Sequence, residues 1–222
     1  MKKPKKPKPA RHEPRLFEPV PVLWPGGTVV CIAGGPSLTV EDVNHVRGKV
    51  DGVVGVNDAY RIAPWLDVLY ACDSKWWDLH KGVPSFKGPK YAMQKQSAKW
   101  RGVNVLQNTG TDGIERRPNG LKTGKNSGYQ AINLAIHLGA KRILLLGYDM
   151  EIKVGSKPHW FGVHPWGGAP PVQSFRGMFR TMVAPLEKMG VTVINCSRST
   201  SLDAFPRMSL ELALPAAQAL AS

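Results

Sequence analysis

Short apolar runs alternate with segments of helical periodicity after residue 26. Apolar runs of four to eight residues bounded by turn residues are typical of buried strands. Such runs predict strands at residues 28–33, 51–56, 66–72, 142–146 and 191–195, with weaker candidates at 91–93 and 103–107.

The clearest helix is predicted at residues 127–138, where apolar residues recur at helical spacing. Asn126 or Ser127 can cap its start, and Gly139 can end it. Further helices are expected at residues 175–189, from about residue 208, and after the capping box formed by residues 39–42.

This alternation predicts one α/β domain over residues 26–222, with a parallel sheet covered by helices on both faces. Residues 1–25 are expected to form a basic, disordered tail, because alternating Lys and Pro suits neither a helix nor a central strand. Its first 15 residues hold seven of the 30 basic residues against one Glu. The net charge of +14 therefore suggests nucleic acid or another polyanion as a partner of the tail, although plain solubility is an equal alternative.

Three widely spaced cysteines indicate neither a disulfide framework nor a zinc site. No stretch approaches the roughly 20 apolar residues of a transmembrane helix. We therefore expect a cytoplasmic protein with no transmembrane segment.

Polar residues follow almost every predicted strand. Since parallel α/β sheets bind ligands outside the carboxyl ends of their strands, these residues are expected to converge on one site. They are Gly34, Gly35, Pro36 and Ser37; Asn57 and Asp58; Asp73; Lys125, Asn126, Ser127 and Gly128; Tyr148, Asp149 and Glu151; and Asn195 and Ser197.

Each of these groups has a structural alternative. Gly34 and Gly35 let the backbone approach a phosphate, or they simply allow a tight turn. Asn57 and Asp58 could bind a ribose or base, or form a turn. Asn126 can be a helix cap, a ligand, or both.

Residues 147–168 hold five glycines together with His159, His164 and several aromatic residues. This composition predicts an active-site lid at about residues 148–172. A neutral histidine there could accept a proton from an attacking hydroxyl. Structural histidines and a partner-binding loop are the alternatives, and the spacing of the histidines predicts no metal site.

Several short motifs, in order, resemble a known family: residues 34–38 (GGPSL), 56–60 (VNDAY), 127–128 (SG), 146–149 (LGYD), 159–164 (HWFGVH) and 201–202 (SL). Over residues 27–212 the chain looks like the small bacterial sialyltransferases that decorate lipooligosaccharide, and like related uncharacterised phage and prophage proteins.

The resemblance implies a Rossmann-like core with a small lid and a CMP-activated sugar as donor, with no metal or other cofactor required. It implies that Gly34 to Ser37 and Asn57 contact the nucleotide, that Asn126 to Gly128 contact the donor, and that His164 is the general base. Gly34 replaces the usual asparagine of the family, and Glu151 replaces a tyrosine that supports the leaving phosphate.

The leading hypothesis is thus an inverting glycosyltransferase that acts on an unknown hydroxyl acceptor. Helix-start amides with Lys122 or Lys125 would balance the charge of the leaving phosphate. A more distant likeness to archaeal-type hydroxymethylpterin pyrophosphokinases suggests a Mg²⁺-dependent diphosphate or nucleotidyl transferase, with Asp73, Asp149 and Glu151 as ligands. The third alternative is a non-enzymatic, phage-encoded protein that binds nucleic acid through its tail.

Overall fold

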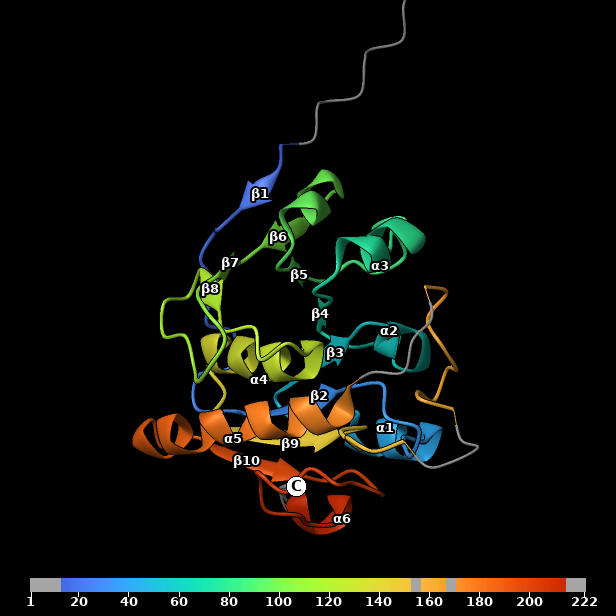
Figure 1. Cartoon of the computed structure of the whole chain (residues 1–222), viewed down its shortest axis with the longest axis vertical. Coiled ribbons are helices and arrows are strands. Elements are labelled where there is room, and N and C mark those ends of the chain that lie inside the picture. The colour runs from blue at the N-terminus through green and yellow to red at the C-terminus, as the bar shows by residue number, and fades with distance from the viewer. Residues whose placement is uncertain (1–12, 153–156, 167–170, 215–222) are drawn as a thin grey trace, which may run out of the picture.

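The computed structural model describes residues 13–152, 157–166 and 171–214, and these form a parallel sheet between two layers of helices (Figure 1). Eight strands of the described chain make this sheet: β1 (Arg15–Leu16), β2 (Thr28–Ile32), β3 (Gly52–Val56), β4 (Val68–Tyr70), β5 (Lys90–Ala92), β6 (Val103–Val105), β9 (Arg142–Leu146) and β10 (Thr192–Asn195). Two short strands, β7 (Gln107–Asn108) and β8 (Gly120–Leu121), pair separately.

The helices are α1 (Val40–Val46), α2 (Ala59–Ile62), α3 (Ser74–Leu79), the 3-10 helix η1 (Lys95–Lys99), α4 (Ser127–His137), α5 (Val172–Lys188) and α6 (Leu210–Ala213). Helices α4 and α5 pack on one face of the sheet, and α1, α2, α3, η1 and α6 pack on the other. Successive residues of a strand point to opposite faces, so Cys31 lies under α4 while Val30 and Ile32 lie under α1. Covering both faces explains why the strands are apolar throughout rather than alternating.

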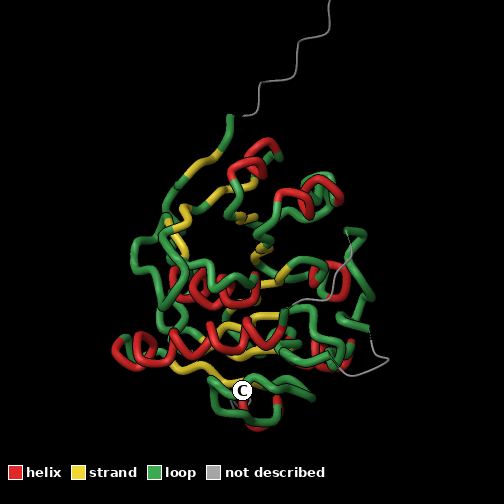
Figure 2. The backbone as a smooth tube through the Cα atoms, viewed as in Figure 1, coloured by secondary structure: helices red, strands yellow, loops and turns green. Residues whose placement is uncertain are grey.

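The strand order is β1-β6-β5-β4-β3-β2-β9-β10, and all neighbours are parallel. The chain builds outward from β2 through β6 and then returns to add β9 and β10 on the other side of β2. The direction of building therefore reverses between β2 and β9, which is the position where open α/β sheets form their ligand crevice. Figure 2 shows the helices, in red, around the strands of the sheet, in yellow.

The predicted α/β fold with helices on both faces is confirmed. The capping box at the start of α1 is also present, since Thr39 accepts a hydrogen bond from the Asp42 amide and Asp42 accepts one from the Thr39 amide. The sequence did not predict α2 and α3, because each is short and lacks a clear apolar period.

The predicted boundary of the N-terminal tail, at residue 25, extends too far into the chain. Arg15 and Leu16 pair with β6, and the Val20 side chain is buried. Trp24 packs against the core, and its amide donates to the Leu138 carbonyl oxygen. The four prolines of residues 13–25 concealed this edge segment, because tertiary contacts rather than periodicity fix it. Residues 1–12, which carry most of the tail charge, lie outside the described residues.

None of the helices in the described residues is long and apolar enough to cross a membrane.

Candidate functional site

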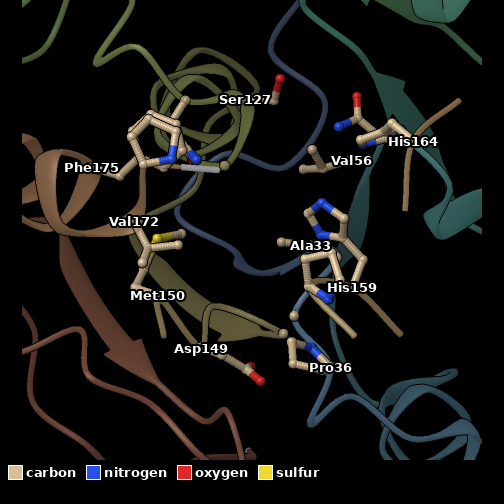
Figure 3. Close-up of a pocket in the computed structure, with 18 of the residues that line it drawn as sticks. Ala33, Pro36, Val56, Ser127, Asp149, Met150, His159, His164, Val172 and Phe175 are labelled. Carbon is tan, nitrogen blue, oxygen red and sulfur yellow. The ribbon is translucent and has the colours of Figure 1, made fainter. Parts of the chain in front are cut away.

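A cavity of about 360 Å³ opens at the carboxyl ends of β2 and β9, where the order of the sheet reverses. Six segments of the described chain line it: the loop after β2, the end of β3, Asp73 after β4, the start of α4, the loop after β9 with the described part of the predicted lid, and the start of α5. Figure 3 shows His159 and His164 on one side of this cavity and Met150, Val172 and Phe175 on the other, with Ser127 at one end.

The glycine loop after β2 is held in place by the carboxylate of Asp149. Asp149 is almost fully buried and accepts hydrogen bonds from the Ser37 amide (2.7 Å) and hydroxyl (2.8 Å). A Cβ atom on Gly35 would come within 2.5 Å of the Gly147 carbonyl oxygen and would also clash with Asp149. Gly35 is therefore required by the contact between two loops, and Asp149 is primarily the residue that locks them together.

Gly34 has a different reason to be glycine. A Cβ atom there would lie 3.1 Å from Nδ1 of His159 and 3.3 Å from the Phe161 ring. Moreover, the amide of Trp160 donates to the Gly34 carbonyl oxygen. The small residue at position 34 thus lets the lid segment lie directly against the loop after β2.

The start of α4 presents hydrogen-bond donors to the cavity. Asn126 caps the helix by accepting from the Tyr129 amide, which leaves the amides of Ser127 and Gly128 without partners inside the helix. Lys125, exposed and in a left-handed conformation (φ 56°), lines the cavity next to them. A helix N-terminus with an adjacent lysine favours an anionic group.

The two lid histidines are held by aromatic stacking. His159 stacks on Phe161 with centroids 4.9 Å apart, and His164 stacks on Trp166 with centroids 4.7 Å apart. Burial and, to a smaller extent, the nearby His164 lower the pKa of His159 to about 4. Burial also lowers the pKa of His164, but the carboxylates of Asp58 and Asp73 oppose this shift. Both imidazoles are therefore neutral at pH 7, and His164 is the stronger base of the two.

Glu151 lines the cavity with its carboxylate held by two serines. Ser199 donates to one carboxylate oxygen (2.5 Å) and Ser201 donates to the other (2.9 Å). These two hydrogen bonds tie Glu151, which follows β9, to the loop that follows β10.

The carboxylates that would have bound Mg²⁺ are held by different parts of the protein. Asp149 is bound by Ser37, Glu151 by two serines, and Asp73 by the Gln94 amide. Within the described ranges, no group of three or more His, Cys, Asp or Glu side chains is placed to hold a metal ion.

Most of the predicted site residues do meet at this cavity: Gly34, Gly35, Pro36, Asn57, Asp73, Lys125, Asn126, Ser127, Gly128, Asp149, His159 and His164 all line it. Asn57 adopts a left-handed conformation (φ 52°), which is well tolerated by asparagine and turns the chain at the end of β3. These residues lie together because the sheet is parallel, so the carboxyl ends of its strands lie along one edge.

Six predicted residues do not line the cavity: Ser37, Asp58, Lys122, Tyr148, Asn195 and Ser197. The last three bond to one another, since the Ser197 hydroxyl accepts from the Tyr148 amide and the Asn195 side-chain oxygen accepts from the Ser197 amide. The Ser37 side chain is bound to Asp149, and Lys122 donates through Nζ to the Thr109 carbonyl oxygen at 2.7 Å. Asp58 is buried and accepts hydrogen bonds from Trp76 Nε1 and Arg61. These side chains bond within the protein, through groups that were predicted to contact a nucleotide or phosphate.

Sequence reasoning missed the apolar wall of the cavity. Met150, Val172 and Phe175 form it, while Val56 and Phe161 add apolar side chains on the histidine side. Apolar residues at strand ends and helix starts look like ordinary core residues in sequence, so only their position in the fold identifies them. The aromatic content of residues 159–166 was the one usable signal.

The sequence matches no family model and no curated protein. Among solved structures, the fold is similar to that of the MAf glycosyltransferase from Magnetospirillum magneticum AMB-1, with a TM-score of 0.61 and 11% sequence identity. The match covers 90% of this chain but only 36% of that chain, so this chain spans about a third of its length. A β-N-acetylhexosaminidase from Bacteroides fragilis NCTC 9343, with a TM-score of 0.20, is too dissimilar to indicate a shared fold.

Proposed function

We propose that the protein is an inverting glycosyltransferase that binds a nucleotide-activated sugar in the cavity between β2 and β9. One observation carries the proposal: two neutral histidines lie in a cavity that is also lined by the start of α4, where the amides of Ser127 and Gly128 have no partner inside the helix. The histidines can act as bases, and the helix-start amides can stabilise the negative charge of a departing phosphate by hydrogen bonding. The fold similarity to a protein named as a glycosyltransferase supports the same reading.

The two sides of the cavity suit the two halves of such a donor. The apolar side chains of Met150, Val172 and Phe175 offer a surface for the flat face of a nucleobase. The amides of Ser127 and Gly128, with the Lys125 ammonium group, offer donors for a phosphate. A nucleotide laid between them places its sugar towards the histidines.

His164 is the better general base because its pKa is lowered less than that of His159. In the proposed step, a ring nitrogen of His164 takes the proton of the acceptor hydroxyl. The acceptor oxygen then bonds to the anomeric carbon, while the bond from that carbon to the phosphate oxygen breaks. The nucleotide leaves with the bonding electron pair, and the configuration at the anomeric carbon inverts.

A CMP-sugar is the donor that we propose to test first. Glu151, which stands in the cavity, is bound by Ser199 and Ser201. These two hydroxyls partly offset its negative charge, so it opposes an anionic donor less than an isolated carboxylate would.

The first experiment is a thermal-shift panel of CMP, CDP, UDP, GDP, AMP and ATP, each with and without Mg²⁺. A nucleotide that binds only the folded protein raises its melting temperature. We expect stabilisation by a cytidine nucleotide that does not depend on Mg²⁺. Stabilisation by ATP only with Mg²⁺ would instead support a phosphoryl or diphosphate transferase, and no shift with any nucleotide would contradict the proposal.

The second experiment measures consumption of the matching nucleotide-sugar by His164→Ala. Removing a general base typically lowers the rate by about 10²–10⁴-fold. The matched control is His45→Ala, on α1 and remote from the cavity lining, which should retain the wild-type rate. Unchanged turnover in His164→Ala would exclude His164 as the base.

A further inference from the structure

A second cavity, of about 340 Å³, lies beside the first and shares part of its wall. The shared wall consists of Asp73, Lys125, Asn126 and Ser127, which line both cavities. The second cavity extends from this wall past Gln94 to Asn108 on β7. It thus begins beside the helix start at which the donor phosphate is proposed to bind, on the side of the carboxyl ends of β4 and β5.

The walls of the second cavity are polar, and several of its side-chain amides are fixed in orientation. Gln94 accepts from the Ser74 amide and hydroxyl and donates to Asp73 Oδ1 at 3.0 Å. Gln130 accepts from the Tyr70 hydroxyl and donates to the Thr123 carbonyl oxygen. The bond from Gln94 holds Oδ1 of Asp73, a residue that lines both cavities.

Asn108 lies at the outer end of the cavity. Its side-chain oxygen accepts from the Gly110 amide at 3.0 Å, which leaves the NH₂ group as a donor with no hydrogen-bond partner among the described residues. Asn108 is exposed, so this donor is accessible to a ligand.

We propose that the second cavity is the acceptor subsite and that it takes a neutral saccharide. This inference rests on the proposed glycosyltransferase function and gives its hydroxyl acceptor a place and a chemical class. Sugar hydroxyls both donate and accept, and the carboxylate, amide and hydroxyl groups that line the cavity match them. An acceptor held there places a hydroxyl at Asp73 and Ser127, at the border of the cavity that contains His164.

The lining favours a saccharide over a second nucleotide. No aromatic ring is among the residues that line this cavity in the described chain, so a nucleobase has no ring to stack on. Among the described residues that line this cavity, the only ammonium group belongs to Lys125, on the wall shared with the first cavity.

The test measures saccharide binding by saturation-transfer-difference NMR, using the methyl glycosides of glucose, galactose, mannose and N-acetylglucosamine as probes. Asn108→Trp blocks the cavity at its exposed outer end. Gln107→Trp is the matched control, because Gln107 is its exposed neighbour on β7 and lines neither cavity. Successive residues of a strand point to opposite faces, so the two variants place the same ring on opposite sides of β7.

We expect at least one glycoside to bind the wild type and Gln107→Trp equally and to lose at least tenfold in affinity for Asn108→Trp. Asn108→Asp, which keeps the oxygen that accepts from Gly110 but loses the NH₂ donor, should weaken binding by about three- to tenfold. In the same samples, the nucleotide that raises the melting temperature should stabilise all four proteins alike.

The outcomes separate the two proposals. If a nucleotide binds but no glycoside does, the saccharide subsite is wrong and the donor site stands. If Asn108→Trp abolishes nucleotide binding, the second cavity holds the nucleotide and the subsite assignment is wrong. If glycosides bind at Asn108 but no nucleotide binds, the transferase function fails while the saccharide site remains.

Discussion

The backbone at Gly35 passes so close to the loop after β9 that no side chain fits there. Contacts of this kind explain most of the single-residue requirements of the site. Asp149 joins the two loops through Ser37, and Gly34 makes room for His159. At the residue scale, the polar groups after the strands therefore serve partly to position one another.

Gly35→Ala tests this interpretation. Its methyl group would displace Asp149 and the Gly147 carbonyl oxygen, so we expect a loss of about 1–3 kcal/mol in the free energy of unfolding. Urea denaturation measures this change. The control is Gly177→Ala on α5, where no atom lies within 4 Å of the added methyl group; it should be neutral or stabilising by less than about 1 kcal/mol. Equal stabilities of the two variants would contradict the interpretation.

The lowered pKa of His164 predicts the acidic limb of the pH–rate profile. The base is active when neutral, and burial lowers its pKa below the ordinary value of 6.5, so kcat/KM should fall only below pH 6.5. The Asp73 carboxylate raises this pKa, so Asp73→Asn should move the limb to still lower pH. Asp78→Asn is the control, since Asp78 lies near the C-terminal end of α3 and forms an ion pair with Lys99 on η1. A limb above pH 6.5 would exclude His164 as the titrating base.

At the scale of elements, α4 contributes most directly to the site. Its sequence pattern alone predicted its position and its apolar face, and the structure confirms both. The pattern offered Asn126 or Ser127 as the cap, and the structure shows that Asn126 caps the helix. The helix packs under β2 and β3, and this packing fixes its N-terminus beside the cavity. The two lysines that precede it were equivalent candidates for phosphate binding, but only Lys125 lines the cavity.

Lys125→Met and Lys122→Met separate these two lysines. Loss of the Lys125 charge should weaken nucleotide binding by about five- to tenfold, measured by isothermal titration, with little effect on stability. Lys122→Met removes the hydrogen bond to the Thr109 carbonyl oxygen, so it should lower stability slightly and leave nucleotide affinity unchanged. A larger affinity loss in Lys122→Met would mean that its side chain turns to the phosphate on binding.

At the scale of the whole molecule, residues 13–25 close one edge of the domain. The Phe17 amide donates to Val105 at the edge of the sheet, and the Val20 amide donates to Pro118. Trp24 lies so close to Gly52 on β3 that a Cβ atom there would clash with the indole ring. This segment therefore belongs to the folded domain.

Two truncations test the position of this boundary. Deleting residues 2–12 should leave the melting temperature unchanged. Deleting residues 2–25 removes β1 and the buried Val20 and Trp24 contacts, so it should cost about 2–4 kcal/mol and lower the melting temperature by several degrees. If both truncations melted alike, the segment would not contribute to the fold.

The shorter truncation also tests the tail as a polyanion-binding segment. Residues 2–12 carry six lysines and arginines, so deleting them should weaken binding to a DNA duplex and flatten its salt dependence. Fluorescence anisotropy at 50 and 200 mM salt measures both effects. Unchanged affinity and slope would exclude the tail as the source of any DNA binding.

The sequence by itself determined the class of fold and the edge of the sheet at which the site lies. Strand and helix periods are local properties, and the carboxyl ends of parallel strands necessarily lie along one edge. The glycine loop, Asn57 and the start of α4 were identified in this way, and the lid histidines were identified from the composition of their loop.

Only the tertiary structure decided which polar side chains face the cavity and what the opposite wall is made of. Ser37 bonds to a residue 112 positions away, and Asp58 bonds to Trp76 on another helix. A hydrogen bond between distant residues leaves no trace in local sequence, and a buried apolar residue looks the same whether it faces the core or a ligand. The reversal of strand order between β2 and β9 is likewise set by the packing of the whole chain, and this reversal opens the cavity.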